Sequence, residues 1–89
     1  RLDFAMYHYQ TTAGGEVDLI LKRGRMIIAI EIKSNAIVDV IQVNKLVRVA
    51  QALKPSQMIY LSQDKTESDI EGVRCVHWQV FLEQLVRLD

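Results

Sequence analysis

The sequence predicts an α/β domain, in which helices flank a mixed β-sheet in the order strand, strand, strand, helix, strand, strand, helix. Two observations lead to this class. Short apolar or aromatic segments are separated by polar, glycine-containing or proline-containing connections, and two stretches repeat apolar residues at helical spacing. The chain has 89 residues, so we expect residues 1–89 to form one small domain.

Three strands are expected in the first part of the chain. Residues 4–10 are rich in aromatic side chains, and residues 16–22 follow a loop with two glycines. Residues 26–33 contain a nearly continuous apolar run, which suits a central strand covered on both faces. Because the turn at residues 22–25 is short and contains glycine, the second and third strands are predicted to form an antiparallel hairpin.

A helix should follow the third strand. Asp39 is its predicted N-cap, and Pro55 ends it because proline disfavours helix in the preceding residue. The apolar positions that recur at helical spacing are Val40, Val43, Val47, Ala50 and Leu53. A helix at this place permits the third and fourth strands to run parallel through a crossover connection.

The remaining residues predict two strands and one helix. Residues 57–61 and 73–77 read as short strands, and the polar segment 62–69 between them reads as a surface loop. Residues 79–88 carry apolar side chains at helical spacing and are predicted to form the terminal helix.

Charge and cysteine content limit the possible functions. The net charge is zero, so contact with DNA would have to come from a local basic patch. The only cysteine, Cys75, lies in an apolar stretch and is predicted to be a core residue, which excludes an internal disulfide and a zinc site built on thiolates. A reduced, cytoplasmic setting fits, and no membrane partner is expected because no segment reaches transmembrane length.

Three charged residues stand inside apolar strands. Asp18 lies in the second strand, and Glu31 and Lys33 share one face of the third, where the hairpin can bring Asp18 close to Glu31. Two neighbouring carboxylates repel each other unless a hard cation such as Mg²⁺ lies between them, and the backbone carbonyl of Ile32 could add a ligand. On spacing alone, however, an ordinary ion pair at a strand end beside a solvated carboxylate is favoured.

The residues that flank Asp18, Glu31 and Lys33 favour a metal site over an ordinary ion pair. Gly-Gly-Glu-Val-Asp at residues 14–18 and Ile-Ala-Ile-Glu-Ile-Lys-Ser at residues 28–34 resemble the PD-(D/E)XK nuclease superfamily. With the aromatic strand at residues 7–9, they resemble most the nuclease-like C-terminal domain of unknown function found on prokaryotic AAA-type ATPases. The resemblance implies a restriction-endonuclease-like core. It also implies that residues 1–89 are the C-terminal fragment of a longer ATPase, whose upstream module is then a partner in the same chain.

The resemblance also assigns roles. Asp18 and Glu31 would be ligands of Mg²⁺, and Lys33 would be the catalytic lysine of a phosphodiesterase acting on DNA. Gln42 matches a glutamine that some branches of the superfamily place on the following helix, and Glu16 is an accessory acid or a surface residue. Members usually have a helix before the first strand, so we expect one upstream; without it, a sheet face or edge is left uncovered, through which a homodimer can form.

Three functions therefore stay open. The first is a metal-dependent nuclease, and the second is a catalytically inactive accessory module that regulates the attached ATPase. The third is a DNA-binding domain without chemistry. It would use the basic residues Lys22, Arg23, Arg25, Lys45 and Arg48, for which a solvated surface is the simpler interpretation.

Overall fold

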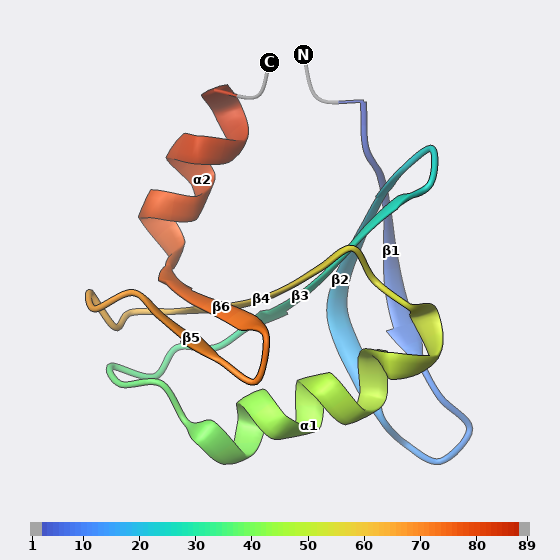
Figure 1. The fold of residues 1–89 in the computed structure, drawn as a ribbon, viewed down its shortest axis with the longest axis horizontal. Helices are drawn as coiled ribbons and strands as arrows, with labels where there is room; N and C mark the ends of the chain where they lie inside the picture. Colours follow the sequence, from blue (N-terminus) through green and yellow to red (C-terminus); the bar gives the residue numbers. More distant parts are fainter. Residues whose placement is uncertain (1–2, 88–89) are drawn as a thin grey trace.

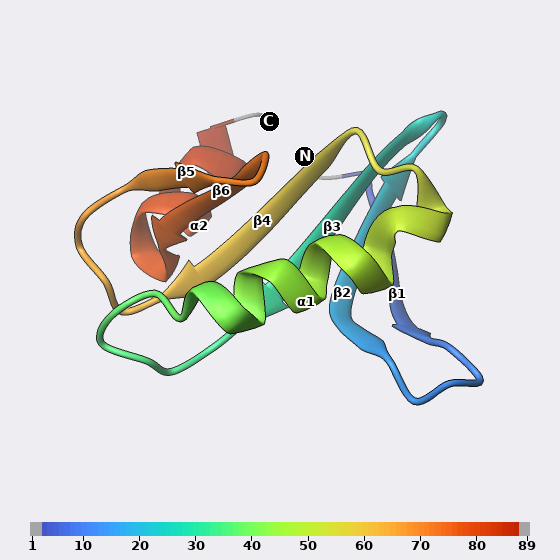
Figure 2. The same ribbon diagram turned by 60° about the horizontal axis from the view of Figure 1, so that its bottom comes forward.

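The protein is an α/β domain built on a six-stranded mixed sheet with two helices, seen in a computed structural model that describes residues 3–87. The strands lie in the order β1-β2-β3-β4-β6-β5. The helix α1 packs on one face of this sheet and α2 on the other, so the domain has three layers (Figures 1 and 2). The predicted fold class is confirmed at this level.

The first three strands are β1 (Ala5–Gln10), β2 (Glu16–Arg23) and β3 (Met26–Ile32), and they pair antiparallel in sequence order. The predicted hairpin of β2 and β3 is confirmed. Four consecutive residues of β3, from Ile28 to Glu31, are buried, as expected of a central strand.

The helix α1 (Val40–Ala50) begins at its predicted N-cap, since the Asp39 carboxylate accepts a hydrogen bond from the Ile41 amide at 2.9 Å. A short 3₁₀ helix, η1 (Gln51–Leu53), extends it almost to Pro55. The chain then enters β4 (Gln57–Ser62), which pairs parallel with β3 as predicted. Of the apolar residues at helical spacing, Val43 and Ala50 are buried, whereas Val40 in the first turn is 50% exposed.

The last part of the chain corrects the predicted strand count. Three strands follow α1, not two, because an additional strand, β5 (Ser68–Ile70), overlaps the end of segment 62–69, which was expected to be a loop. It pairs antiparallel with β6 (Val73–His77). Ser62 also belongs to β4 and is fully buried. A three-residue edge strand is too short to show a period in the sequence.

The terminal helix α2 (Trp78–Arg87) follows β6 directly and buries Phe81 against the sheet. Leu88, which was included in the predicted helix, lies outside the described residues. Cys75 is fully buried, as predicted for a core residue. No helix in residues 3–87 is long and apolar enough to cross a membrane.

Two apolar clusters hold the layers together. The cluster under α1 includes Val17, Ala29 and Tyr60, and the cluster under α2 includes Ile30 and Phe81. Each fully buried aliphatic or aromatic side chain contributes about 1.5–3 kcal/mol relative to its exposed state. The two clusters also fix which face each strand residue takes, and this decides where the candidate site lies.

Candidate functional site

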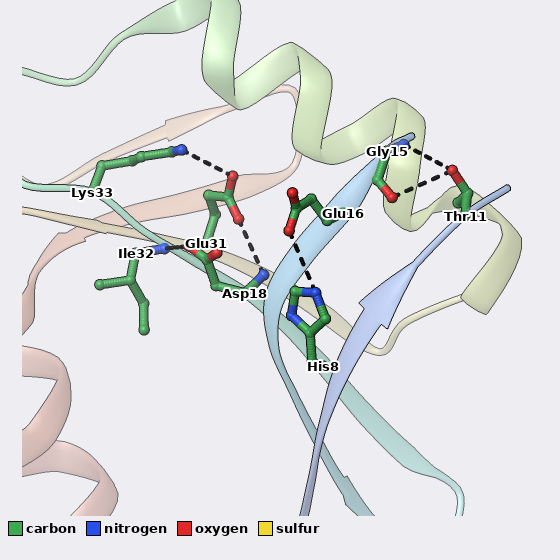
Figure 3. Close-up of polar contacts among 8 residues, drawn as sticks. All are labelled: His8, Thr11, Gly15, Glu16, Asp18, Glu31, Ile32 and Lys33. Atoms are coloured by element: carbon green, nitrogen blue, oxygen red, sulfur yellow. Dashed lines mark hydrogen bonds and ion pairs between the residues drawn. The ribbon is translucent and has the colours of Figure 1, made fainter. Parts of the chain in front are cut away.

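The candidate site lies where β2 and β3 stop pairing with each other. The regular pairing of this hairpin ends at Leu19 and Ile30, so Asp18 and Glu31 stand opposite each other one step further along. The two carboxylates replace the missing ladder bonds. The Asp18 amide donates to Glu31 Oε1 at 3.2 Å, and the Ile32 amide donates to Asp18 Oδ2 at 2.9 Å (Figure 3).

An irregularity in β2 sets the position of Asp18. On β1, one residue separates Tyr7 from Tyr9, but two residues separate their partners Ile20 and Val17 on β2. This is a β-bulge, and Asp18 lies within it. Bulges bend a strand and re-aim a side chain, and here the Asp18 carboxylate reaches the backbone of β3.

Lys33 completes the predicted group. Its ammonium lies 3.4 Å from Glu31 Oε2, the oxygen of Glu31 that does not bond Asp18 (Figure 3). Glu31 and Lys33 therefore do share a face, as the alternation of β3 predicted. This is the face of the sheet that α1 covers, because Ala29, two residues before Glu31, belongs to the cluster under that helix.

The electrostatics of Glu31 are unusual. Burial raises the pKa of its carboxyl, and the neighbouring Asp18 charge raises it further, while the Asp18 amide and the Lys33 ammonium lower it. The net direction is upward, so Glu31 ionises less readily than an ordinary glutamate. A cation placed between the two carboxylates would offset both causes of the increase, because a nearby positive charge favours the ionised form.

Gln42 is linked to the site by Tyr60, a residue that the sequence did not single out. The Tyr60 hydroxyl lies 2.7 Å from Gln42 Oε1 on α1 and 3.2 Å from Asn35 Oδ1 on the connection after Lys33. Tyr60 is the register partner of Glu31 on β4 and is fully buried. It ties α1 and the connection to the strand beside the site. No signal in the sequence distinguishes Tyr60, because a tyrosine in an apolar strand can be either a core residue or a site residue.

The connection between β3 and α1 is held by β4 and the loop after it. The Lys33 amide donates to the Leu61 carbonyl at 2.9 Å, and the Gln63 amide donates to the Asn35 carbonyl at 2.9 Å. The Asp64 carboxylate accepts from the Val38 amide at 3.1 Å. These bonds fix the segment that carries Lys33.

The other predicted residues lie apart from this group. Glu16 contacts His8, with the carboxylate 3.4 Å from Nε2, and both side chains are about half exposed (Figure 3). Through this contact the Glu16 carboxylate lies against β1, whereas the Asp18 carboxylate reaches β3.

The five basic residues divide between two places. Lys22, Arg23 and Arg25 lie on or beside the turn of the hairpin, and the Arg23 guanidinium stands 4.7 Å above the Phe4 ring. Lys45 and Arg48 lie on α1 and line a groove between this helix and the loop joining β1 to β2. The five residues therefore form two separate basic patches, one on the hairpin and one on α1.

The donor set was compared with what a metal ion requires. No group of three or more His, Cys, Asp or Glu side chains able to hold a metal occurs among residues 3–87. Two adjacent carboxylates suit Mg²⁺, which is held by one or two protein carboxylates and keeps several waters, better than Zn²⁺, which takes three or four protein ligands.

Comparison with known proteins gives one match. A family model described as "Domain of unknown function (DUF4143)" matches residues 1–81. No curated protein and no solved structure matches the chain. The matched range contains all six strands, α1 and each residue of the candidate site.

Proposed function

The chain belongs to the DUF4143 family of domains of unknown function, and we propose that it is a nuclease-like domain of the PD-(D/E)XK type that hydrolyses DNA phosphodiester bonds with Mg²⁺. The observation that carries this proposal is the meeting of Asp18, Glu31 and Lys33 at the end of the β2–β3 pairing. The α/β architecture by itself is weaker support, since one fold hosts many functions.

The chemistry of the group fits this role. Asp18 and Glu31 would hold the ion, which would supply Lewis-acid stabilisation of a phosphate oxygen and a more acidic water. The Lys33 ammonium lies on the same face and offers a positive charge to a phosphate oxygen as negative charge develops there. The raised pKa of Glu31 also favours this reading, because perturbed carboxyl groups gather at functional sites.

The test is Mg²⁺ binding by calorimetry together with DNA cleavage, both in the full-length protein. We expect Asp18→Asn to abolish Mg²⁺ binding and cleavage, and Lys33→Ala to abolish cleavage while leaving Mg²⁺ bound. Glu16→Gln is the matched control, because it removes one carboxylate charge from the same strand at an exposed pair. Absence of both Mg²⁺ binding and cleavage in the unaltered protein rejects the proposal.

One observation favours a second function, an inactive accessory module that regulates an attached ATPase. The Asp18 and Glu31 carboxylates each accept a backbone amide of the other strand, so the pair has a structural use without any metal. An asparagine at position 18 can still accept the Ile32 amide. If the module acts only as a scaffold, Asp18→Asn will leave the ATPase rate and cellular function of the parent protein unchanged.

A further inference from the structure

A groove lies between α1 and the loop that joins β1 to β2. Its volume is about 530 Å³, and the loop contributes Thr11, Gly14 and Gly15 to its wall. The helix contributes Lys45, Arg48 and Val49. The groove is a different place from the carboxylate site, since it shares no lining residue with it.

The charge of the groove has one sign. Lys45 and Arg48 are three residues apart on α1, so their side chains leave the helix on one side. The lining includes no aspartate or glutamate, and neither cation forms an ion pair within residues 3–87. Two unpaired cations beside a concave surface suit an anion.

The loop and the helix pack closely against each other in the wall of the groove. A Cβ atom at Gly15 would lie 2.8 Å from Val49 Cγ2, so the loop approaches the helix as closely as glycine allows. Thr11 holds the loop closed, since its backbone amide donates to the Gly15 carbonyl at 2.7 Å. Its hydroxyl also accepts from the Gly15 amide at 2.9 Å and donates to the Gly15 carbonyl at 3.3 Å (Figure 3). The groove therefore exists before any ligand arrives.

The groove and the carboxylate site are consecutive along β2. Gly15 precedes Asp18 by three residues, which is about 10 Å of extended strand. Both places lie on the side of the sheet that α1 covers. The other basic patch is different, because Arg23 lies over Phe4, which packs against the cluster under α2.

We propose that this groove binds a backbone phosphate of the same nucleic-acid strand whose phosphodiester lies at Asp18 and Glu31. The inference rests on the proposed function and adds the path of the substrate across the domain. Successive phosphates of one strand advance about 3.4 Å along a duplex axis, so the two places are about three nucleotides apart in that measure.

The expected recognition is independent of base sequence. The Arg48 guanidinium offers a planar pair of donors to phosphate oxygens, and the Lys45 ammonium adds a point charge. Contacts of this type fix the register and direction of a strand on the protein without reading bases. The groove would thus set which phosphodiester reaches the carboxylates.

The test measures binding of a fluorescent DNA oligonucleotide by anisotropy in EDTA, over a series of salt concentrations, in the full-length protein. We expect Lys45→Gln with Arg48→Gln to weaken binding on the order of tenfold and to lower the salt slope by about 1 to 2. The matched control is Lys22→Gln with Arg25→Gln, which removes the same charge from the hairpin turn. We expect that control to bind like the unaltered protein.

The outcomes separate the groove from the chemistry. Equal losses in both double variants, or no loss in the groove variant, overturn the proposal even if DNA is cleaved. A selective loss in the groove variant supports it even if cleavage is absent, in which case only the proposed nuclease activity fails. If circular dichroism shows that the double glutamine variant does not fold, Arg48→Lys with Lys45→Met is tested in its place. The same two outcomes then support or overturn the proposal.

Discussion

Glu31 is a nearly buried carboxylate whose ionisation is opposed by its surroundings. Its exposed fraction is 8%, and burial together with the Asp18 charge raises its pKa above the ordinary 4.5. The folded chain therefore holds the Glu31 proton to a higher pH than the unfolded chain does. The stability that this group contributes is complete below pH 4.5 and is lost as the pH rises through the raised value.

The first prediction follows from that sign. Glu31→Gln keeps an oxygen for the Asp18 amide and removes the charge, so at pH 7 we expect it to increase the free energy of unfolding by on the order of 1 kcal/mol. Urea denaturation at several pH values measures this, and the difference should disappear below pH 4.5. Glu83→Gln on the exposed part of α2 is the control and should change little. A less stable Glu31→Gln at pH 7 would show that the Lys33 ion pair outweighs the cost of burial.

The second prediction concerns Tyr60. Removing its hydroxyl in Tyr60→Phe leaves the Gln42 and Asn35 oxygens without their shared donor, which should cost about 1–2 kcal/mol. Burial raises the pKa of this hydroxyl, so it stays protonated and able to donate at neutral pH. Denaturation measures the loss, and Tyr7→Phe on the exposed strand β1 is the matched control. Equal stability of the two variants contradicts a positioning role for Tyr60.

At this scale, sequence reasoning reached some contacts and missed others. The nearness of Asp18 to Glu31 followed from a short hairpin, and the pairing of Glu31 with Lys33 followed from strand alternation. The bulge could not be predicted, because it depends on how β1 and β2 share a register over many residues. The link from Tyr60 to Gln42 depends on tertiary packing between β4 and α1.

The contact of the β1–β2 loop with α1 gives a prediction at the scale of elements. Gly15→Ala places a methyl group against Val49, a stiff β-branched side chain, so we expect a loss of about 1–3 kcal/mol. The double variant Gly15→Ala with Val49→Ala should recover most of that loss, because it makes room for the new methyl. Thermal unfolding of the single and double variants measures the coupling. Additive losses would show that the close approach is unimportant.

A second element, the loop between β4 and β5, depends on Asp64. The Thr66 and Val38 amides that donate to its carboxylate lower its pKa below the ordinary 3.8. A lowered pKa gives stability that is present above the ordinary value and is lost as the pH falls through the lowered one. We therefore expect Asp64→Ala to reduce the melting temperature at pH 7, and we expect this difference to shrink as the pH falls below 3.8. A difference that stays constant over that pH range contradicts a role through the charge.

Sequence patterns predicted elements well where hydrophobic periods were long. The bounds of β1, β4 and β6 and the start of α1 were found to within a residue, because turns and an N-cap delimit them. The edge strand β5 was missed, because three residues are too few to show a hydrophobic period. Its pairing with β6, and not its composition, makes it a strand.

For the whole molecule, the layer order predicts where unfolding begins. The strands β3 and β4 lie in the middle of the sheet with a helix on each side, whereas β1 and β5 are its edges. We expect amide hydrogen exchange to be slowest in β3 and β4 and fastest in β1 and β5. Mass spectrometry of exchanged peptides measures this. Protection of β1 as strong as that of β3 would instead indicate that a second copy or another segment pairs with its free edge.

The arrangement of the layers was less accessible to sequence reasoning than the elements were. The parallel neighbours β3 and β4 follow from the intervening helix, but the place of β6 between β4 and β5 does not. The strand order depends on which edge of the sheet is free for pairing, and the local sequence does not show which edge that is.

The bulge in β2 has a consequence for how freely the domain can change its chemistry. Val17 and Ile20 both pack under α1, although residues three apart lie on opposite faces of a regular strand, so β2 consists of two half-strands in opposite phase. Asp18 stands at the phase boundary, exposed to solvent, while its neighbour Val17 is fully buried. Neither core constrains the side chain at this position. The residue at position 18 can therefore be exchanged, by selection or by design, without repacking the interior, and only its hydrogen bond with the Ile32 amide is at stake.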